Sequence, residues 1–127
     1  MAKTTPTVLI VEDEPFLMKI LVDKLSLEKF PLLSGANGEE GLKLALEKHP
    51  DIILLDILMP RMNGIEMLTE LRKDAWGKKV PVIMLTNLND PDHISQAKAL
   101  NAKDFIVKAD WKLSELVVKM RKYLSES

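Results

Sequence analysis

The sequence predicts a doubly wound α/β fold, in which helices cover both faces of a five-stranded parallel sheet. Short runs of Val, Ile and Leu alternate along the chain with amphipathic segments of helical length. Within each run the apolar residues are consecutive, which is typical of strands that are buried on both faces. Strands separated by helices indicate parallel, right-handed crossover connections.

The predicted strands are five apolar runs. They are Val8–Val11, Phe30–Leu33, Ile52–Leu55, Val82–Leu85 and Phe105–Val107. In an open parallel sheet, ligands bind beyond the carboxyl ends of the strands. We therefore expect the functional side chains to be those that follow these runs.

Five predicted helices follow the strands. Asn37 and Asn63 each stand three residues before a glutamate, which is the spacing of a capping box, and Pro15 and Pro91 suit a first helical position. We expect residues 1–127 to form a single domain. In chain order the apolar helix faces contain Leu17, Ile20, Leu21 and Leu25; Leu42, Ala45 and Leu46; Ile65, Leu68 and Leu71; Ile94, Ala97 and Leu100; and Leu113, Leu116, Val117, Met120 and Leu124.

Composition excludes several kinds of function. The chain has no cysteine, so disulfides, thiolate metal sites and cysteine nucleophiles are ruled out. The net charge of -1 gives no broad attraction to nucleic acid or to anionic membranes, and no basic cluster surrounds Trp76 or Trp111. His49 and His93 are expected at the surface. We expect a cytoplasmic protein, because residues 1–7 contain no apolar run.

Polar side chains follow four of the five runs. Glu12 and Asp13 follow the first, Asp56 the third, Thr86 the fourth and Lys108 the fifth. Three carboxylates held together repel one another unless a cation intervenes, and Mg²⁺ is the ion that best fits such oxygen ligands and phosphate. Lys108 and Thr86 would hold phosphoryl oxygens while Asp56 attacks phosphorus. Each residue alone is ordinarily a cap or surface residue, so the order of the set carries the inference.

These motifs resemble the receiver domain of two-component response regulators, and in particular its chemotaxis members. The resemblance extends from about the first strand to the last helix and implies a flavodoxin-like sheet in the order 2-1-3-4-5. The matching motifs are Val11-Glu12-Asp13-Glu14-Pro15, then Asp56-Ile57-Leu58-Met59-Pro60 with Gly64, then Thr86, and finally Phe105-Ile106-Val107-Lys108.

The resemblance implies a role for each matching residue. Asp56 would accept the phosphoryl group, with Thr86 and Lys108 contacting its oxygens. Thr86 and Phe105 would then switch position and alter the surface of the fourth helix, fifth strand and fifth helix. The implied Mg²⁺ ligands are Glu12, Asp13, Asp56 and the backbone carbonyl of Leu58.

The resemblance also implies the partners. The donor would be a phosphohistidine on a sensor histidine kinase or a histidine phosphotransfer protein, and a downstream protein target would read the altered surface. Direct binding to nucleic acid or membrane is not expected. The protein would catalyse only its own phosphotransfer and dephosphorylation, without acting as a turnover enzyme.

Three residues depart from the family pattern, and they keep alternatives open. Ala109 replaces a proline, and because a cis bond before it would cost ~2.5–4 kcal/mol, a trans bond is expected there. Asn87 follows Thr86 where a small residue is common, and Glu12 replaces an aspartate. One alternative is a pseudo-receiver, a docking module not regulated by phosphorylation. Another is an aspartate-nucleophile phosphatase, but no second acid stands two residues after Asp56.

Overall fold

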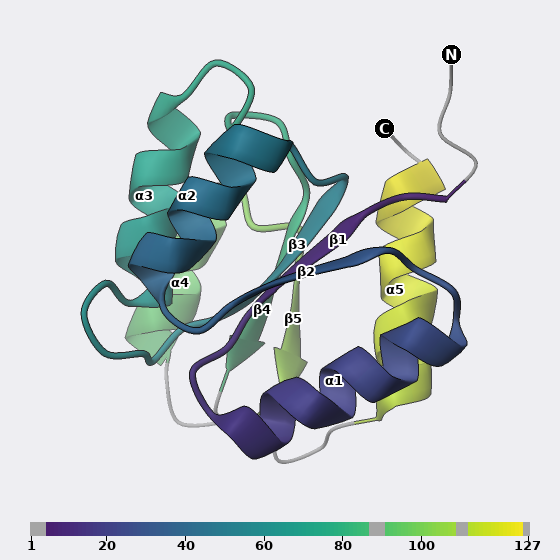
Figure 1. Ribbon diagram of the computed structural model, residues 1–127. Helices are drawn as coiled ribbons and strands as arrows, with labels where there is room; N and C mark the ends of the chain where they lie inside the picture. The colour runs from purple at the N-terminus through teal and green to yellow at the C-terminus, as the bar shows by residue number, and fades with distance from the viewer. Residues whose placement is uncertain (1–4, 87–90, 109–111, 126–127) are drawn as a thin grey trace.

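The computed structural model describes residues 5–86, 91–108 and 112–125, and within them strands and helices alternate (Figure 1). The strands form one parallel sheet in the order β2-β1-β3-β4-β5. No helix in these ranges is long and apolar enough to cross a membrane. The elements are β1 Val8–Val11, α1 Pro15–Leu27, β2 Leu32–Gly35, α2 Gly38–Lys48, β3 Ile52–Asp56, α3 Gly64–Lys73, β4 Val82–Thr86, α4 Pro91–Ala99, β5 Asp104–Val107 and α5 Leu113–Ser125. The predicted fold and strand order are confirmed.

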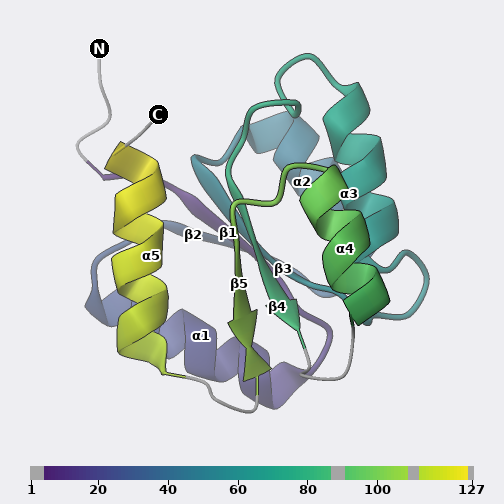
Figure 2. The same ribbon diagram turned by 180° about the vertical axis from the view of Figure 1, so that it is seen from behind.

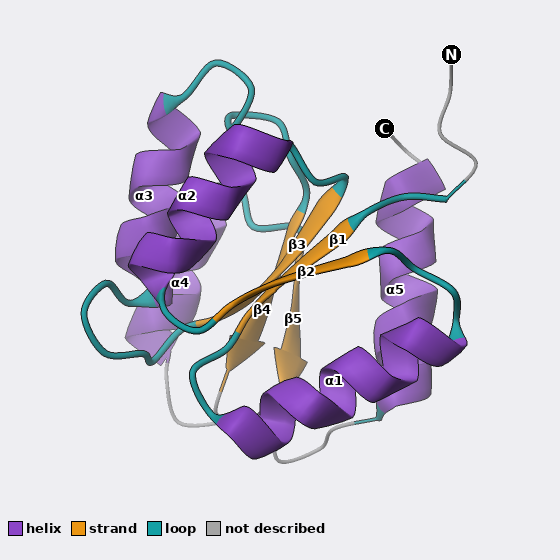
Figure 3. Ribbon diagram, viewed as in Figure 1, coloured by secondary structure: helices purple, strands orange, loops and turns teal. Residues whose placement is uncertain are grey.

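The sheet separates two apolar cores. Helices α1 and α5 cover one face, while α2, α3 and α4 cover the other, as the views from the front and from behind agree (Figures 1, 2 and 3). Along β1, Val8 and Ile10 face the α1/α5 core, whereas Leu9 and Val11 face the opposite core. All four side chains are fully buried. Consecutive apolar residues therefore serve both layers, because side chains alternate across a strand.

The helix starts follow the predicted signals. Pro15 is the first residue of α1, and Asn37 and Asn63 cap α2 and α3. At α3 the capping box is complete, because Asn63 Oδ1 accepts from Glu66 N at 2.9 Å while Glu66 Oε1 accepts from Asn63 N at 3.0 Å. At α2, Asn37 Oδ1 accepts from Glu40 N at 2.9 Å. These caps fix the loops that lead away from β2 and β3.

The predicted position of the second strand is wrong. The prediction placed it at Phe30–Leu33, whereas β2 spans Leu32–Gly35. The end of α1 takes up the intervening residues, since Lys29 has a φ of 67° and Phe30 N donates to Leu25 O at 3.2 Å. Phe30 is buried in the α1/α5 core. Its apolar character therefore serves the packing of the helix end and not the strand.

Candidate functional site

Three carboxylates meet at the carboxyl edge of the sheet. Glu12 follows β1 and Asp56 is the last residue of β3, and these two strands are neighbours at the centre of the sheet. Only 1% of Glu12 and 3% of Asp56 is exposed, while Asp13 is half-buried. One carboxylate oxygen from each of Glu12, Asp13 and Asp56 lies within 4.8 Å of the others. We call these three residues the acid pocket.

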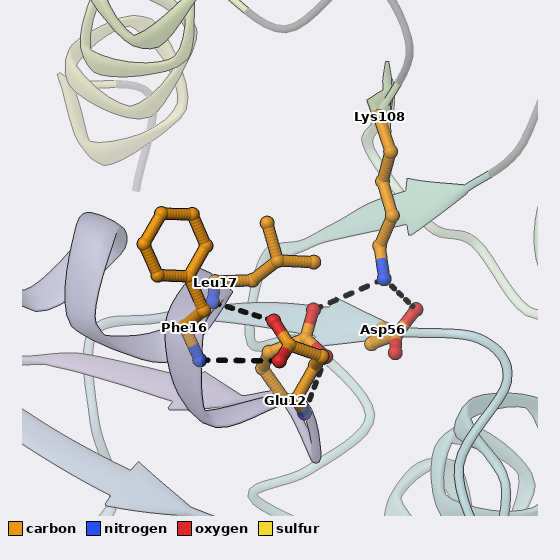
Figure 4. Close-up of polar contacts among 6 residues, drawn as sticks. Glu12, Phe16, Leu17, Asp56 and Lys108 are labelled. Atoms are coloured by element: carbon orange, nitrogen blue, oxygen red, sulfur yellow. Dashed lines mark hydrogen bonds and ion pairs between the residues drawn. The ribbon is translucent and has the colours of Figure 1, made fainter.

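Lys108 brings a positive charge to the acid pocket from β5. Its Nζ lies 2.9 Å from Asp56 Oδ1 and 3.1 Å from Glu12 Oε1 (Figure 4). The lysine side chain is only 19% exposed. It follows directly after β5, so it must reach past β4 to contact residues of β3 and β1. The structure therefore joins four of the five residues predicted from the strand ends.

Burial controls the protonation of this cluster. It raises the pKa of Asp56 to about 7, the negative charge of Glu12 adds to the rise, and the hydrogen bond from Lys108 opposes it. Burial alone would lower the pKa of Lys108, but the hydrogen bonds and charges of Asp56 and Glu12 outweigh it and raise that pKa. A single ammonium cannot neutralise three neighbouring carboxylates, so the pocket favours a further cation or a proton.

The oxygens of the pocket fit a hard divalent cation. Glu12 Oε2 accepts from Glu14 N at 3.0 Å, whereas the buried Glu12 Oε1 has only the ion pair with Lys108 and no well-aligned hydrogen bond among the described residues. A buried carboxylate oxygen with so little compensation costs free energy. Converging carboxylate oxygens are the ligands that Mg²⁺ prefers, so the donor set is suitable for it.

Glu14 shows which nearby acid does not belong to the pocket. Its carboxylate accepts from Phe16 N at 3.3 Å and from Leu17 N at 2.8 Å, so it caps α1. This cap holds the loop that carries Glu12 and Asp13. This cap by Glu14 was not predicted, although an acidic residue directly before a proline at the helix start is a usable signal.

Thr86 and Phe105 lie on the adjacent strands β4 and β5. Thr86 ends β4 and is 2% exposed, and in the ladder it pairs with Val107 while Met84 pairs with Phe105. The Phe105 ring is half-buried on the face covered by α4, where Lys98 Nζ lies 5.9 Å from its centroid. Thr86 thus ends the strand next to the one that carries Asp56, Phe105 lies against α4, and their switching stays a prediction.

Gly64 and Leu58 belong to the segment that leaves β3. Gly64 N donates to Ile57 O at 2.8 Å, and a Cβ added at Gly64 would stand 2.2 Å from the carbonyl oxygen of Asp56. Only glycine therefore fits against the backbone of the proposed phosphoacceptor. Leu58 follows Asp56 in this segment and 51% of it is exposed. Its role as a carbonyl ligand stays a prediction.

Two of the three departures from the family pattern, Asn87 and Ala109, lie outside the described residues. The expected trans bond between Lys108 and Ala109 is therefore not tested. Glu12 is described, and its carboxylate reaches Lys108 as well as Glu14 N. His49 is exposed as expected, whereas His93 is half-buried on α4.

The response regulator receiver domain model matches residues 8–121 of this chain. The chain belongs to the response regulator receiver family. Protein PilH of Pseudomonas aeruginosa is 35% identical to it over 101 residues, which cover 80% of this chain and 84% of PilH. Chemotaxis protein CheY4 of Vibrio cholerae shares the fold with a TM-score of 0.87 and 26% identity, covering 94% of this chain and 99% of CheY4. The predicted family is confirmed.

Other relatives of this receiver domain are longer. Ycf27 of Guillardia theta, named a probable transcriptional regulator, is 40% identical over 106 residues. These residues cover 84% of this chain but 41% of Ycf27. The receiver domain thus spans less than half the length of several curated regulators that it matches. That residues 1–127 form a single domain stays a prediction.

Proposed function

We propose that this receiver domain is a phosphorylation switch in which Asp56 accepts a phosphoryl group from a phosphohistidine in the presence of Mg²⁺. The observation that carries the proposal is the convergence of Glu12, Asp13, Asp56 and Lys108 at the carboxyl edge of the sheet. In the transfer, an oxygen of Asp56 bonds to phosphorus as the bond from phosphorus to the histidine nitrogen breaks. The displaced imidazole leaves with the donor protein.

Each residue of the pocket has a part in this proposal. Glu12, Asp13, Asp56 and the carbonyl of Leu58 would hold Mg²⁺, which when bound neutralises carboxylate charge and contacts phosphoryl oxygens. Lys108 Nζ already lies 2.9 Å from Asp56, so it is placed to donate to an oxygen of the new phosphoryl group. The nucleophile must be ionised. Positive charge near Asp56 therefore matters, because burial and the charge of Glu12 raise the pKa of that carboxyl to about 7 even though the hydrogen bond from Lys108 opposes the rise.

The proposed output surface consists of α4, β5 and α5. Thr86 is adjacent to Asp56 in the sheet, since β4 pairs with β3, and Phe105 lies on the next strand beside α4. A phosphoryl group that attracts the Thr86 hydroxyl would shift the balance between two arrangements of this region, and a downstream protein would read the result. The donor would be a sensor histidine kinase or a histidine phosphotransfer protein.

No observation favours the alternatives over the switch. The pseudo-receiver reading depended on Asn87 and Ala109, which lie outside the described residues. The phosphatase reading lacks a general acid, because the residue two positions after Asp56 is Leu58. We therefore propose that the protein catalyses only its own phosphotransfer and dephosphorylation.

Mass spectrometry after incubation with acetyl phosphate and Mg²⁺ tests the proposal. We expect one added phosphoryl group, mapped to Asp56, and none when Mg²⁺ is removed by chelation. Asp56→Asn should abolish the modification. Asp23→Asn is the matched control, because Asp23 is an exposed aspartate that pairs with Lys19 and is not one of the three carboxylates of the acid pocket. Phosphorylation that persists in Asp56→Asn would overturn the proposal, and so would an unmodified wild type that still binds its kinase.

A further inference from the structure

The end of the molecule opposite the acid pocket carries a stacked pair of rings. His49 caps the C-terminus of α2 with a φ of 48°, and Trp76 lies in the segment between α3 and β4. Their ring centroids are 4.3 Å apart with an interplanar angle of 9°. The carboxylate of Asp74 fixes this segment, because it accepts from Trp76 N at 3.0 Å and from Gly77 N at 2.9 Å. These two hydrogen bonds therefore fix the backbone that carries Trp76.

The position of the stack separates it from the phosphorylation chemistry. Helix α2 and the segment that follows α3 meet at the top of Figure 1, while the strands β4 and β5 point downward to the edge where Lys108 meets Asp56. The stack lies at the amino edge of the sheet, because Asp51 immediately precedes β3 and Pro81 immediately precedes β4. Nothing bound there would touch the acid pocket.

A hollow of about 270 Å³ opens beside the stacked rings. Rings and prolines form much of its wall, which is how proteins commonly receive a proline or an aromatic side chain of a peptide. We call it the amino-edge hollow. Its lining includes His49, Pro50, Asp51, Trp76, Lys79 and Pro81.

Three lysines are in the lining of the amino-edge hollow or next in sequence to residues that line it. Lys48, Lys78 and Lys79 are exposed, and none of them forms an ion pair or side-chain hydrogen bond within the described ranges. Two nearby carboxylates already accept backbone donors: that of Asp74, and that of Asp51, which accepts from Thr7 N at 2.7 Å. In a chain whose net charge is -1, this gathering of unpaired cations is a local feature.

We propose that the amino-edge hollow is a docking site for an acidic peptide segment of a partner protein. An aromatic or proline side chain of the segment would enter the hollow against Trp76, and flanking carboxylates would meet Lys48, Lys78 and Lys79. A peptide fits better than a nucleic acid, because three lysines supply too few phosphate contacts for a nucleic-acid chain. The site works whether or not Asp56 is phosphorylated, so it goes beyond the switch.

NMR titration of the ¹⁵N-labelled full chain with acetyl-Glu-Glu-Tyr-Pro-Glu-Glu-amide tests this. We expect concentration-dependent shifts of the Trp76 indole N–H and of the amides of residues 48–51 and 75–80. The amides around Asp56 should stay in place. A matched peptide with glutamine at every glutamate position should bind roughly tenfold more weakly at low salt. Absence of shifts, shifts centred elsewhere or equal binding of both peptides would overturn the proposal.

Charge-reversal variants separate the site from general electrostatics. The double variant Lys78→Glu with Lys79→Glu should weaken binding of the acidic peptide by roughly tenfold or more. The double variant Lys43→Glu with Lys112→Glu carries the same change in net charge at exposed lysines that do not line the hollow, and should bind normally. An equal loss of peptide binding in both double variants would overturn the proposal. Tighter binding of a single-stranded oligothymidylate to the same residues would also sink it, because it would make the surface a nucleic-acid site.

Discussion

At the scale of single residues, Lys108 is the charge on which the acid pocket depends. Its ammonium lies between two carboxylates that are almost fully buried, Glu12 and Asp56. Lys108→Met would leave both without that compensation, and we expect the free energy of unfolding at pH 7 to fall by roughly 1–3 kcal/mol. Urea unfolding followed by circular dichroism measures the loss. Lys103→Met, at an exposed lysine before β5, should change it by less than about 0.5 kcal/mol. Equal losses would contradict the role of Lys108.

Asp104 gives the residue-scale prediction for pH. Its Oδ2 accepts from Lys119 Nζ at 2.8 Å and from Tyr123 Oη at 2.9 Å, and its Oδ1 accepts from Phe105 N. Burial by itself would raise the pKa of Asp104, but these donors outweigh it and hold the pKa below its ordinary value. The stabilisation is therefore fully present above the unfolded value of about 3.9 and is lost as the pH falls through the lower folded value.

Asp104→Asn should show this dependence. Near pH 7 we expect it to lower the free energy of unfolding by about 1 kcal/mol, and the difference from wild type should shrink steadily below pH 4. Urea titrations at a series of pH values follow the difference. Asp23→Asn removes only an exposed pair with Lys19 and should show no comparable dependence. A difference that stays constant down to pH 3 would argue against the ion pair.

At the scale of elements, Arg72 ties α3 to two separate loops. Its guanidinium donates to four backbone carbonyls, those of Gly77, Val80, Leu100 and Asn101, at 2.7 to 3.1 Å. Burial lowers the pKa of Arg72, in keeping with a guanidinium enclosed by carbonyls. The C-terminal end of α4 is thereby anchored to α3, while its N-terminal end begins at Pro91, the next described residue after Thr86.

Arg72→Met should release this anchor. We expect a loss of roughly 2–4 kcal/mol in the free energy of unfolding, because several carbonyls lose their donors together. Amide hydrogen exchange should accelerate at residues 99–102 more than in β1. The matched control is Arg61→Met. Arg61 is exposed, and its ion pair with Glu39 is long, with 4.0 Å between Nη1 and Oε2. Similar effects of the two substitutions would contradict the anchor.

Two glycines distinguish packing from site geometry. A Cβ at Gly64 would stand 2.2 Å from Asp56 O, whereas a Cβ at Gly41 would stand 2.6 Å from a methyl group of Val11. Gly64→Ala must move backbone next to the phosphoacceptor, so it should slow phosphorylation by acetyl phosphate by roughly tenfold or more. Gly41→Ala should destabilise the fold by about 1–3 kcal/mol but leave the phosphorylation rate of the folded fraction close to wild type. Rates normalised to folded protein decide between them, and equal rates would refute a special role for Gly64.

The sequence predicted most elements because local signals and tertiary packing agree in this chain. Consecutive apolar residues such as Val8 to Val11 face two cores, and Asn63 with Glu66 forms the capping box that their spacing indicated. The prediction failed at Phe30, because an apolar residue after a helix packs into the core as readily as a strand residue does. The predicted strand ends identified Asp56 and Lys108 as site residues. Their 2.9 Å contact could not be predicted in the same way, because it depends on the order of the strands in the sheet.

At the scale of the whole molecule, the sheet places opposite charges at its two edges. The carboxyl edge gathers Glu12, Asp13 and Asp56, while the amino edge carries Lys48 and Lys79 beside the stacked rings. The expectation that no basic cluster surrounds Trp76 is wrong, because Lys78 and Lys79 follow Trp76 and the contact between Trp76 and His49 brings in the end of α2 with Lys48. Net charge therefore excludes a broad polyelectrolyte surface and does not exclude local ones.

The acid pocket should also couple metal binding to the stability of the whole domain. A cation that binds only the folded chain adds RT ln(1 + [L]/Kd), so Mg²⁺ at ten times its Kd should add about 1.4 kcal/mol, which corresponds to a rise in Tm of roughly 3–6 °C. Asp13→Asn and Asp56→Asn should each lose most of the rise, whereas Asp23→Asn, which is outside the acid pocket and pairs with Lys19, should keep it. Differential scanning calorimetry with MgCl₂, compared with NaCl at equal ionic strength, separates binding from screening. A rise that is the same in all four proteins, or the same in both salts, would mean that the three carboxylates do not act together as one metal site.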